Sequence, residues 1–202
     1  MNPPAVATKG KIIVVEGTDK AGKTTQSRML AEAIKVLGKI SVVIDFPDYT
    51  TPIGMEIKAF LDRKRDYPAE AKHLLFSANR WEKKKEIDSM VESGTIVVLN
   101  RYWQSNLSYG AANDIDTNWL LNLDKGLPKE DLVVVILVNP DISSKRAATQ
   151  DAFESNPQLA AKAYKNYLKF AKQFGWKVID GSKNKDQVHQ EVMKIVKKEL
   201  KV

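Results

Sequence analysis

The stretch Gly17-Thr18-Asp19-Lys20-Ala21-Gly22-Lys23-Thr24 decides the fold, because it follows the pattern G-x-x-x-x-G-K-[ST] of a phosphate-binding loop. In such a loop, backbone N–H groups wrap the phosphates of a nucleotide and Lys23 reaches the β and γ phosphates. The Thr24 hydroxyl takes a magnesium position. Glycines are needed in the loop because a side chain would hold the backbone away from the anion.

The neighbouring sequence supplies the strand and the helix that this loop requires. A β-branched run, residues 12–15, enters the loop. One face of the helix that leaves it is marked by apolar residues at helical spacing: Met29, Leu30, Ala33, Ile34 and Leu37. The sequence therefore predicts a nucleotide-binding loop. The alternative is an ordinary strand, turn and helix that bind no ligand.

The composition of the chain is that of one globular domain. It has 202 residues, of which 43% are hydrophobic and 28% are charged. Cysteine is absent, which excludes disulfides, thiolate metal ligands and a cysteine nucleophile. No apolar run has the length of a membrane span, and residues 1–10 lack the hydrophobic segment of a signal peptide. We expect a flexible tail over residues 1–10, one domain over residues 11–202, and a cytoplasmic protein that binds no membrane.

The formal net charge of +7 suits a protein that holds several phosphates, but it also suits a nucleic-acid partner. The local pattern favours the first interpretation. The basic runs at residues 63–65 and 83–85 are each flanked by carboxylates, as on solvated helix faces. We expect small phosphorylated partners and no nucleic acid.

Five apolar runs predict the strands of a sheet, at residues 12–15, 40–45, 95–99, 132–138 and 176–179. Helical segments separate them, among them a long helix from Tyr67-Pro68 to about Val91 and an amphipathic helix that closes the chain. Strands that are apolar throughout and separated by helices indicate an α/β fold with a parallel sheet covered on both faces.

The predicted sheet brings four segments to one edge. In parallel sheets the ligand lies beyond the carboxyl ends of the strands. These ends carry residues 17–24, 45–49, 100–102 and 139–141. We therefore expect the functional site along this edge.

Two charged residues inside the loop bear on the reaction. The phosphates would repel the Asp19 carboxylate, so it is expected to point away from them and to accept a hydrogen bond, for example from a sugar hydroxyl of a second substrate. The alternative is that Asp19 caps the following helix or pairs with Lys20. Lys20 adds a positive charge where a transferred phosphoryl group would develop charge. Positioned cations of this kind are the main catalytic device in phosphoryl transfer.

A second group of residues lies in Leu74-Leu75-Phe76-Ser77-Ala78-Asn79-Arg80-Trp81-Glu82. On a helix, Phe76 and Arg80 fall about 40° apart. An aromatic ring with a guanidinium one turn away can stack on a base and bind its edge or a phosphate. Core packing with a surface arginine is the alternative.

Together these segments resemble the thymidylate kinase family, in its eukaryotic type. The resemblance runs from about Gly10 to residues 180–183, and its motifs include Glu16-Gly17, the loop, Phe46-Pro47, the block at 74–82, Arg101-Tyr102 and residues 126–128. It implies a P-loop NTPase-type three-layer α/β/α fold with a five-stranded parallel sheet. It also implies transfer of the γ-phosphoryl group of ATP to dTMP, giving dTDP and ADP, with Mg²⁺ and as a homodimer.

The resemblance also assigns roles to single residues. Lys23 becomes the phosphate-binding lysine, Asp19 holds the deoxyribose 3′-hydroxyl, and Lys20 stands where the eukaryotic-type enzymes place a catalytic arginine. Phe76 would stack on thymine, Arg80 would bind its edge, and Arg101 would bind the monophosphate. The expected ATP-binding residues are Gly17, Ala21, Gly22, Lys23, Thr24, Thr25 and Arg146, the last packing on adenine from a lid at about residues 141–156. The expected substrate-binding residues are Asp19, Phe46, Phe76, Arg80, Arg101 and Ser105, and Lys23, Lys20, Asp19 and Arg101 are the expected catalytic residues.

This sequence departs from the family pattern at three positions. Asn100 replaces the aspartate of D-R-[YH], so it either orients metal-bound water or leaves the metal held more weakly. Tyr49 stands where an arginine normally grips the monophosphate. Ala152 replaces a lid arginine.

These departures keep two alternatives open. Tyr49 motivates a related kinase of altered specificity, acting for example on dUMP or on a deoxynucleoside. Asn100 together with Ala152 motivates a nucleotide-binding protein with little catalytic activity. An active thymidylate kinase, slowed rather than abolished by Asn100, is the main prediction.

Overall fold

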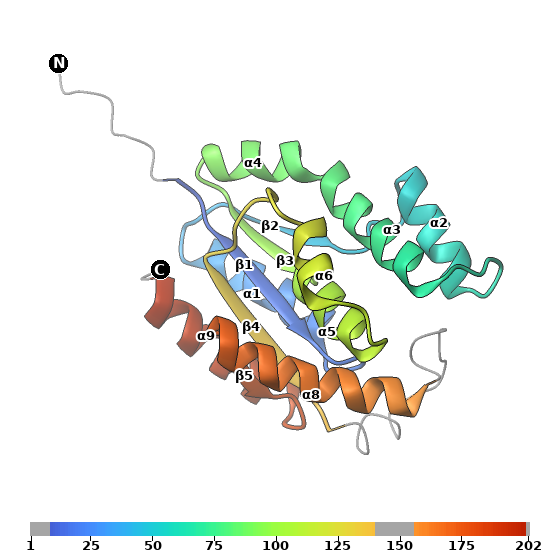
Figure 1. Ribbon diagram of the computed structural model, residues 1–202. Coiled ribbons are helices and arrows are strands. Elements are labelled where there is room, and N and C mark those ends of the chain that lie inside the picture. Colours follow the sequence, from blue (N-terminus) through green and yellow to red (C-terminus); the bar gives the residue numbers. More distant parts are fainter. Residues whose placement is uncertain (1–8, 140–155, 201–202) are drawn as a thin grey trace.

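Five parallel strands form one sheet in the order β2-β3-β1-β4-β5. The computed structural model describes residues 9–139 and 156–200 (Figure 1). The strands are β1 (Ile12–Gly17), β2 (Ser41–Asp45), β3 (Ile96–Asn100), β4 (Leu132–Leu137) and β5 (Lys177–Asp180). All five lie within a residue or two of the predicted runs, so the predicted parallel sheet is confirmed.

Helices cover both faces of this sheet, which makes three layers (Figure 1). The helices in the described part of the chain are α1 (Lys23–Val36), α2 (Pro52–Leu61), α3 (Ala69–Glu82), α4 (Lys84–Glu92), α5 (Trp103–Ala112), α6 (Thr117–Leu123), α8 (Pro157–Phe174) and α9 (Lys185–Leu200). Within residues 9–139 and 156–200, none of them is long and apolar enough to cross a membrane.

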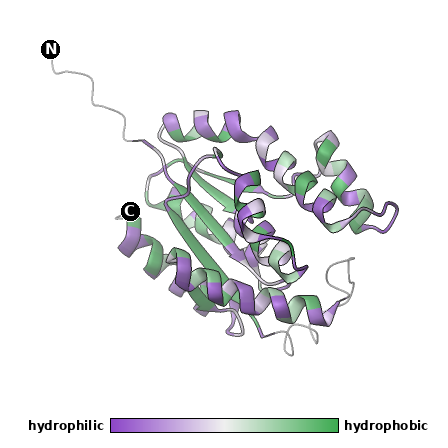
Figure 2. Ribbon diagram, viewed as in Figure 1, coloured by the Kyte–Doolittle hydropathy of each residue, from purple (hydrophilic) through white to green (hydrophobic). Residues whose placement is uncertain are grey.

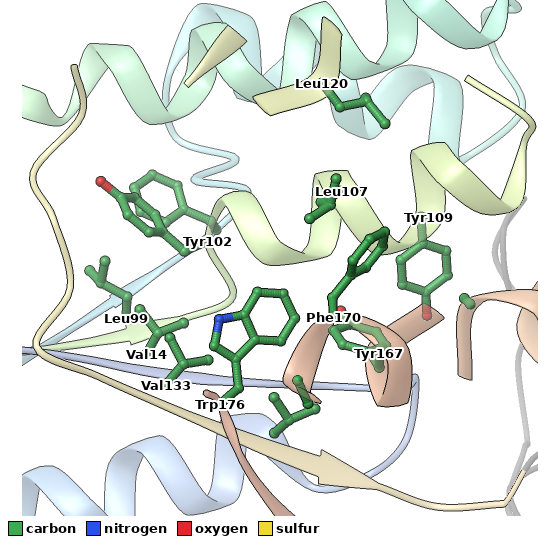
Figure 3. Packing of buried hydrophobic residues seen from close by; sticks show 14 of the residues in the cluster. Val14, Leu99, Tyr102, Leu107, Tyr109, Leu120, Val133, Tyr167, Phe170 and Trp176 are labelled. Atoms are coloured by element: carbon green, nitrogen blue, oxygen red, sulfur yellow. The ribbon is translucent and has the colours of Figure 1, made fainter. Parts of the chain in front are cut away.

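The alternation of side chains along each strand produces two separate cores. Ile13 and Val15 of β1 face α1 and α9, whereas Ile12 and Val14 face α4, α5 and α8. Figure 2 shows the apolar strands enclosed by helices whose outer faces are polar. In the second core, Trp176 and Phe170 pack with Leu107 against the sheet (Figure 3). Because both faces of the inner strands β1, β3 and β4 are buried, these strands are apolar except for Glu16 and Asn100.

The predicted long helix from residue 67 to about 91 is wrong in one respect, because the chain forms two helices, α3 and α4, that meet at Lys83. The two helices pack on different partners. Residues of α4 such as Ile87 and Val91 enter the core against the sheet, whereas α3 packs beside α2 and α5. At the junction, the Lys83 ammonium binds Asp48 at 2.9 Å. Residues 82–86 are all charged and include no glycine or proline, so the sequence carries no breaking signal at the junction.

Two predicted segments lie largely outside the described residues. The predicted lid at about 141–156 does so except for Asn156, which caps α8. In the predicted tail over residues 1–10, Gly10 is described, and it belongs to the fold because it is buried and donates to the Val91 carbonyl at 2.8 Å.

Candidate active site

The phosphate-binding loop joins β1 to α1, as the sequence predicts. Gly17 has φ 139°, and a Cβ there would lie 1.8 Å from the Ile136 carbonyl oxygen, so no side chain fits. Gly22 has φ 88° and begins α1 without a side-chain cap. The N–H groups of the first turn of α1 therefore lie at the positive end of the helix dipole. This arrangement suits an anion.

The two lysines of the loop differ in burial. Lys23 is only 7% exposed, and its ammonium donates to the Thr18 carbonyl at 2.7 Å, across the loop. Its nitrogen lies 4.0 Å from an Asp19 carboxylate oxygen. Lys20 is half-buried and adopts φ 60° in the loop itself. Both cations thus lie where phosphates would be cradled.

A cavity beside the loop is lined by all six predicted substrate-binding residues: Asp19, Phe46, Phe76, Arg80, Arg101 and Ser105. They come from the loop, from the ends of β2 and β3, and from α3 and α5. The edge predicted for the functional site is therefore where these residues meet. Tyr49, which stands at a family arginine position, also lines this cavity.

Arg101 is aimed into the cavity by its backbone. Directly after β3 it adopts φ 68°, and its N–H donates to the Val15 carbonyl at 3.0 Å. Its guanidinium donates to Ser105 Oγ at 3.0 Å and pairs with the Asp19 carboxylate. The planar Arg101 guanidinium, held at the end of β3, is suited to bind a phosphate.

Asp19 is held by groups across the cavity. In addition to Arg101, the Tyr109 hydroxyl donates to its carboxylate at 2.6 Å. Burial acts to raise the pKa of Asp19, but Arg101, Lys23 and Tyr109 together hold that pKa below its ordinary value. Asp19 is therefore an ionised acceptor that faces the cavity. Neither role in the alternative interpretation, a cap or a partner of Lys20, accounts for these contacts.

Glu16 organises the site from beneath, a role that the sequence did not reveal. It is fully buried, and it accepts from the N–H of Tyr102 at 2.8 Å and from the N–H and hydroxyl of Ser105 at 3.0 and 2.8 Å. The Tyr167 hydroxyl of α8 donates to it at 2.8 Å. A buried carboxylate needs such partners. An acidic residue inside an apolar strand was the available clue.

The α3 face carries Phe76 and Arg80 into the cavity, as predicted. Phe76 packs edge-on against Phe60 of α2, with ring centroids 5.5 Å apart. Arg80 is 3% exposed and binds both oxygens of Asp124 at 2.7 and 3.0 Å. This pair fixes the guanidinium, so Arg80 is a rigid side of the cavity rather than a surface arginine.

One turn before Phe76, His73 of α3 also lines the cavity. Its Nδ1 lies 2.5 Å from Asn106 Oδ1, and the Asn106 amide nitrogen donates to the His73 carbonyl at 3.2 Å. The second bond fixes the amide, so Nδ1 must carry the proton. Burial lowers the pKa of His73. The ring is therefore neutral.

The end of β3 meets the loop through Asn100. The Asn100 amide nitrogen donates to Thr24 Oγ1 at 3.1 Å and to Asp45 Oδ1 at 2.6 Å. Asp45 ends β2 directly opposite Asn100, and Arg28 of α1 binds its other oxygen at 3.1 Å. Asp45 is a further residue that sequence reasoning placed at the edge without a role. Arg146 and Ala152 lie outside the described residues.

The comparisons with known proteins agree with this geometry. The family described as Thymidylate kinase matches residues 15–192. The chain belongs to the thymidylate kinase family. Thymidylate kinases from Danio rerio and Homo sapiens are each 35% identical to it, over 91% and 92% of this chain and 88% and 89% of theirs. A solved structure of thymidylate kinase from Candida albicans, described with the origin of its broad substrate specificity, superposes with a TM-score of 0.82 at 32% identity, over 94% of this chain and 92% of that one.

Membership in the thymidylate kinase family makes the fold that of a P-loop nucleotide kinase, as the sequence predicted. The match spans the loop, the cavity, the end of β1 and the other four strands. Thymidylate kinases are ATP-dependent nucleoside monophosphate kinases.

Proposed function

We propose that this protein transfers the γ-phosphoryl group of ATP to dTMP, giving dTDP and ADP. The observation that carries this proposal is the position of the cavity, which opens beside the phosphate-binding loop and combines an aromatic ring with the fixed guanidiniums of Arg80 and Arg101. Such a cavity suits an aromatic base at one end and a phosphate at the other. It places the acceptor next to the donor phosphates, as phosphoryl transfer requires.

The residues of the cavity have separate proposed roles. Phe76 stacks on thymine, Phe46 closes the cavity beside it, and Arg80 binds the edge of the base. Asp19 accepts the 3′-hydroxyl of the deoxyribose, since it is ionised and faces the cavity. Arg101 binds the monophosphate, and Ser105 holds that guanidinium in place. When the monophosphate binds, it competes with Asp19 for Arg101.

The loop residues act on ATP. The backbone N–H groups from Gly17 through Thr25, including those of Ala21 and Gly22, surround the phosphates, and Lys23 leaves the Thr18 carbonyl to bind them. Lys20 stabilises charge on the transferred phosphoryl group. Arg146 is proposed to pack on adenine.

The residues around Thr24 fit a magnesium ion. The Thr24 hydroxyl is an exposed oxygen ligand, and Asn100 Oδ1 is a buried acceptor without a partner among the described residues. Oxygen ligands and retained water molecules are what Mg²⁺ prefers. When bound, the ion neutralises charge on the β and γ phosphates. We propose that Thr24 binds it and that Asn100 orients one of its water molecules.

Two wider properties are also proposed. The family resemblance supports a homodimer, which light scattering of the purified protein would test. A cytoplasmic location is consistent with the helices of the described residues, none of which could span a membrane.

The experiment that tests the proposed function is an ADP-release assay with dTMP, dUMP, dGMP, dCMP and dAMP as acceptors. We expect dTMP to have the highest kcat/KM. No turnover of dTMP at any Mg²⁺ concentration would exclude the proposal and leave a nucleotide-binding protein without this activity.

A second candidate, a related kinase of altered specificity, is favoured by Tyr49. This residue lines the cavity where a charged side chain would contact the monophosphate. The broad specificity ascribed to the Candida albicans enzyme makes the same assay informative. With thymidine added to the panel, phosphorylation of dUMP or thymidine at a higher kcat/KM than dTMP would support this alternative.

A further inference from the structure

At its nucleotide site the chain departs from the usual set of metal-binding residues. Phosphate-binding loops of this kind hold Mg²⁺ with the loop Ser or Thr hydroxyl and with an aspartate that follows a neighbouring strand. Here Thr24 provides the hydroxyl, but β3, the strand beside β1, ends in the neutral amide of Asn100. A divalent cation next to Thr24 would therefore lack a carboxylate from this strand.

A carboxylate lies one strand further along the same edge. Asp45 ends β2 and is paired in register with Asn100. The single amide nitrogen of Asn100 donates both to Asp45 Oδ1, at 2.6 Å, and to Thr24 Oγ1, at 3.1 Å. The Asn100 amide thus links Asp45, through two hydrogen bonds, to the Thr24 hydroxyl that would bind the metal.

Within residues 9–139 and 156–200, the two other carboxylates closest to the loop in sequence, Glu16 and Asp19, are engaged elsewhere. Glu16 is fully buried beneath the loop with the Tyr102 and Ser105 donors. Asp19 faces the cavity, where Arg101 and Tyr109 hold it. In contrast, the side chain of Asp45 is 43% exposed, and its one described cationic partner is Arg28, which is itself 56% exposed. The Asp45 carboxylate can therefore exchange that surface partner for a hydrated cation at little cost.

The Asn100 side chain supports the same conclusion. Asn100 is 8% exposed, and its Oδ1 accepts no hydrogen bond from the described residues. Both acceptors of its nitrogen are fixed, so the amide cannot turn without losing them. Mg²⁺ is usually held by one or two carboxylates and retains several water molecules, which are strong donors. A carboxylate and an amide oxygen on adjacent strands suit such a hydrated ion.

We propose that Asp45 supplies the carboxylate for the magnesium ion of the bound nucleotide, through metal-bound water, and that Asn100 is the positioning residue that holds it beside Thr24. The carboxylate has moved from the end of β3 to the end of β2, and the site keeps its negative charge. This inference rests on the proposed magnesium-dependent activity.

The test measures metal binding directly, apart from catalysis. Mn²⁺ is titrated into the protein saturated with ADP, and free Mn²⁺ is measured by electron paramagnetic resonance. Asp45→Asn should weaken Mn²⁺ binding by about 10-fold or more, which is the usual effect of losing a partner of the metal's ligands. ADP affinity without metal should change less than about 2-fold. The matched control is Asp62→Asn, which removes another ion-paired surface carboxylate, at the end of α2.

A double variant tests specifically whether the negative charge has moved from the end of β3 to the end of β2. Asp45→Asn with Asn100→Asp returns the carboxylate to β3, and it should recover Mn²⁺ affinity to within about 3-fold of the parent. Mn²⁺ binding by Asp45→Asn equal to that of the parent would overturn the proposal, as would a double variant as weak as the single one. Thermal melts show whether each variant is folded, and Asp45→Ser replaces Asp45→Asn if the latter does not fold.

The same titration separates this inference from the proposed function. A parent protein that fails to phosphorylate dTMP but loses Mn²⁺ affinity with Asp45→Asn would refute the kinase activity and leave the metal site intact. A parent that phosphorylates dTMP while Asp45→Asn binds Mn²⁺ normally would refute only the metal site.

Discussion

Phe76 is the residue whose proposed role is simplest to isolate. It lines the cavity from the middle of α3, and stacking of a base on an aromatic ring contributes about 1–3 kcal/mol by alanine substitution. We expect Phe76→Ala to raise KM for dTMP on the order of ten-fold or more and to leave KM for ATP nearly unchanged. Steady-state kinetics with each substrate varied would measure this. Leu74→Ala is the control, since Leu74 is on the same helix but is exposed. Equal rises in both KM values would contradict thymine stacking.

Glu16 is a second single residue with a testable role, because we expect it to stabilise the site. It accepts from Tyr102, Ser105 and Tyr167 with no exposure to solvent. In Glu16→Gln an amide N–H₂ group would face some of these donors, which should lower the free energy of unfolding by about 2–4 kcal/mol. Urea denaturation would measure the change. Glu32→Gln, at an exposed position of α1, should change it by less than about 0.5 kcal/mol. A similar small change for Glu16→Gln would mean that the network tolerates an amide.

At the scale of elements, the packing of α3 on α5 makes the stability of the fold depend on pH. His73 of α3 is buried against Asn106 of α5, and burial outweighs the Asn106 hydrogen bond, so its pKa lies below the ordinary value of 6.5. Arg80 and Lys72 also lower this pKa, and Glu70 opposes them. Below pH 6.5 the unfolded chain takes up a proton that the folded chain resists, so stability is complete above that pH and falls as the pH drops toward the lowered pKa.

Between pH 7.5 and pH 5.5 the loss should be at most about 1.4 kcal/mol, since one proton corresponds to ~1.4 kcal/mol per pH unit and the unfolded chain takes it up only below about pH 6.5. Urea denaturation at the two pH values would measure it, and His73→Gln should remove most of the difference. The chain has one other histidine, His189 of α9, which is half-buried and also has a lowered pKa. His189→Gln should remove less. A His73→Gln variant with the full pH dependence would locate the titration elsewhere.

Some elements could be predicted from the sequence and others could not, for physical reasons. The strands were predictable because burial on both faces requires mostly apolar residues along β1 and β4, with Glu16 as the exception. The break at Lys83 was not, because residues 82–86 are all charged and no glycine or proline marks the junction. The six cavity residues were expected from the loop, the helical block at 74–82 and the family resemblance. The bonds that fix them, such as Ser105 to Glu16 and Arg80 to Asp124, join residues distant in the chain, so local patterns carry no trace of them.

At the scale of the whole molecule, the ion pair between Arg101 and Asp19 joins the end of β3 to the phosphate-binding loop. A monophosphate that takes over Arg101 should tie the same elements through the ligand. A ligand at 100 times its Kd stabilises the folded state by about 2.7 kcal/mol, or on the order of 5–10 °C in Tm for a chain of this size.

We therefore expect dTMP to raise Tm by several degrees, and thymidine, which lacks the phosphate, to raise it clearly less at the same concentration. Differential scanning fluorimetry with each ligand would measure this. In Arg101→Lys the charge remains but the fork that binds both Ser105 and Asp19 is lost, so dTMP should lose most of its advantage over thymidine. Equal shifts with dTMP and thymidine in the unaltered protein would show that Arg101 does not bind the phosphate and that the Asp19 pair persists in the complex.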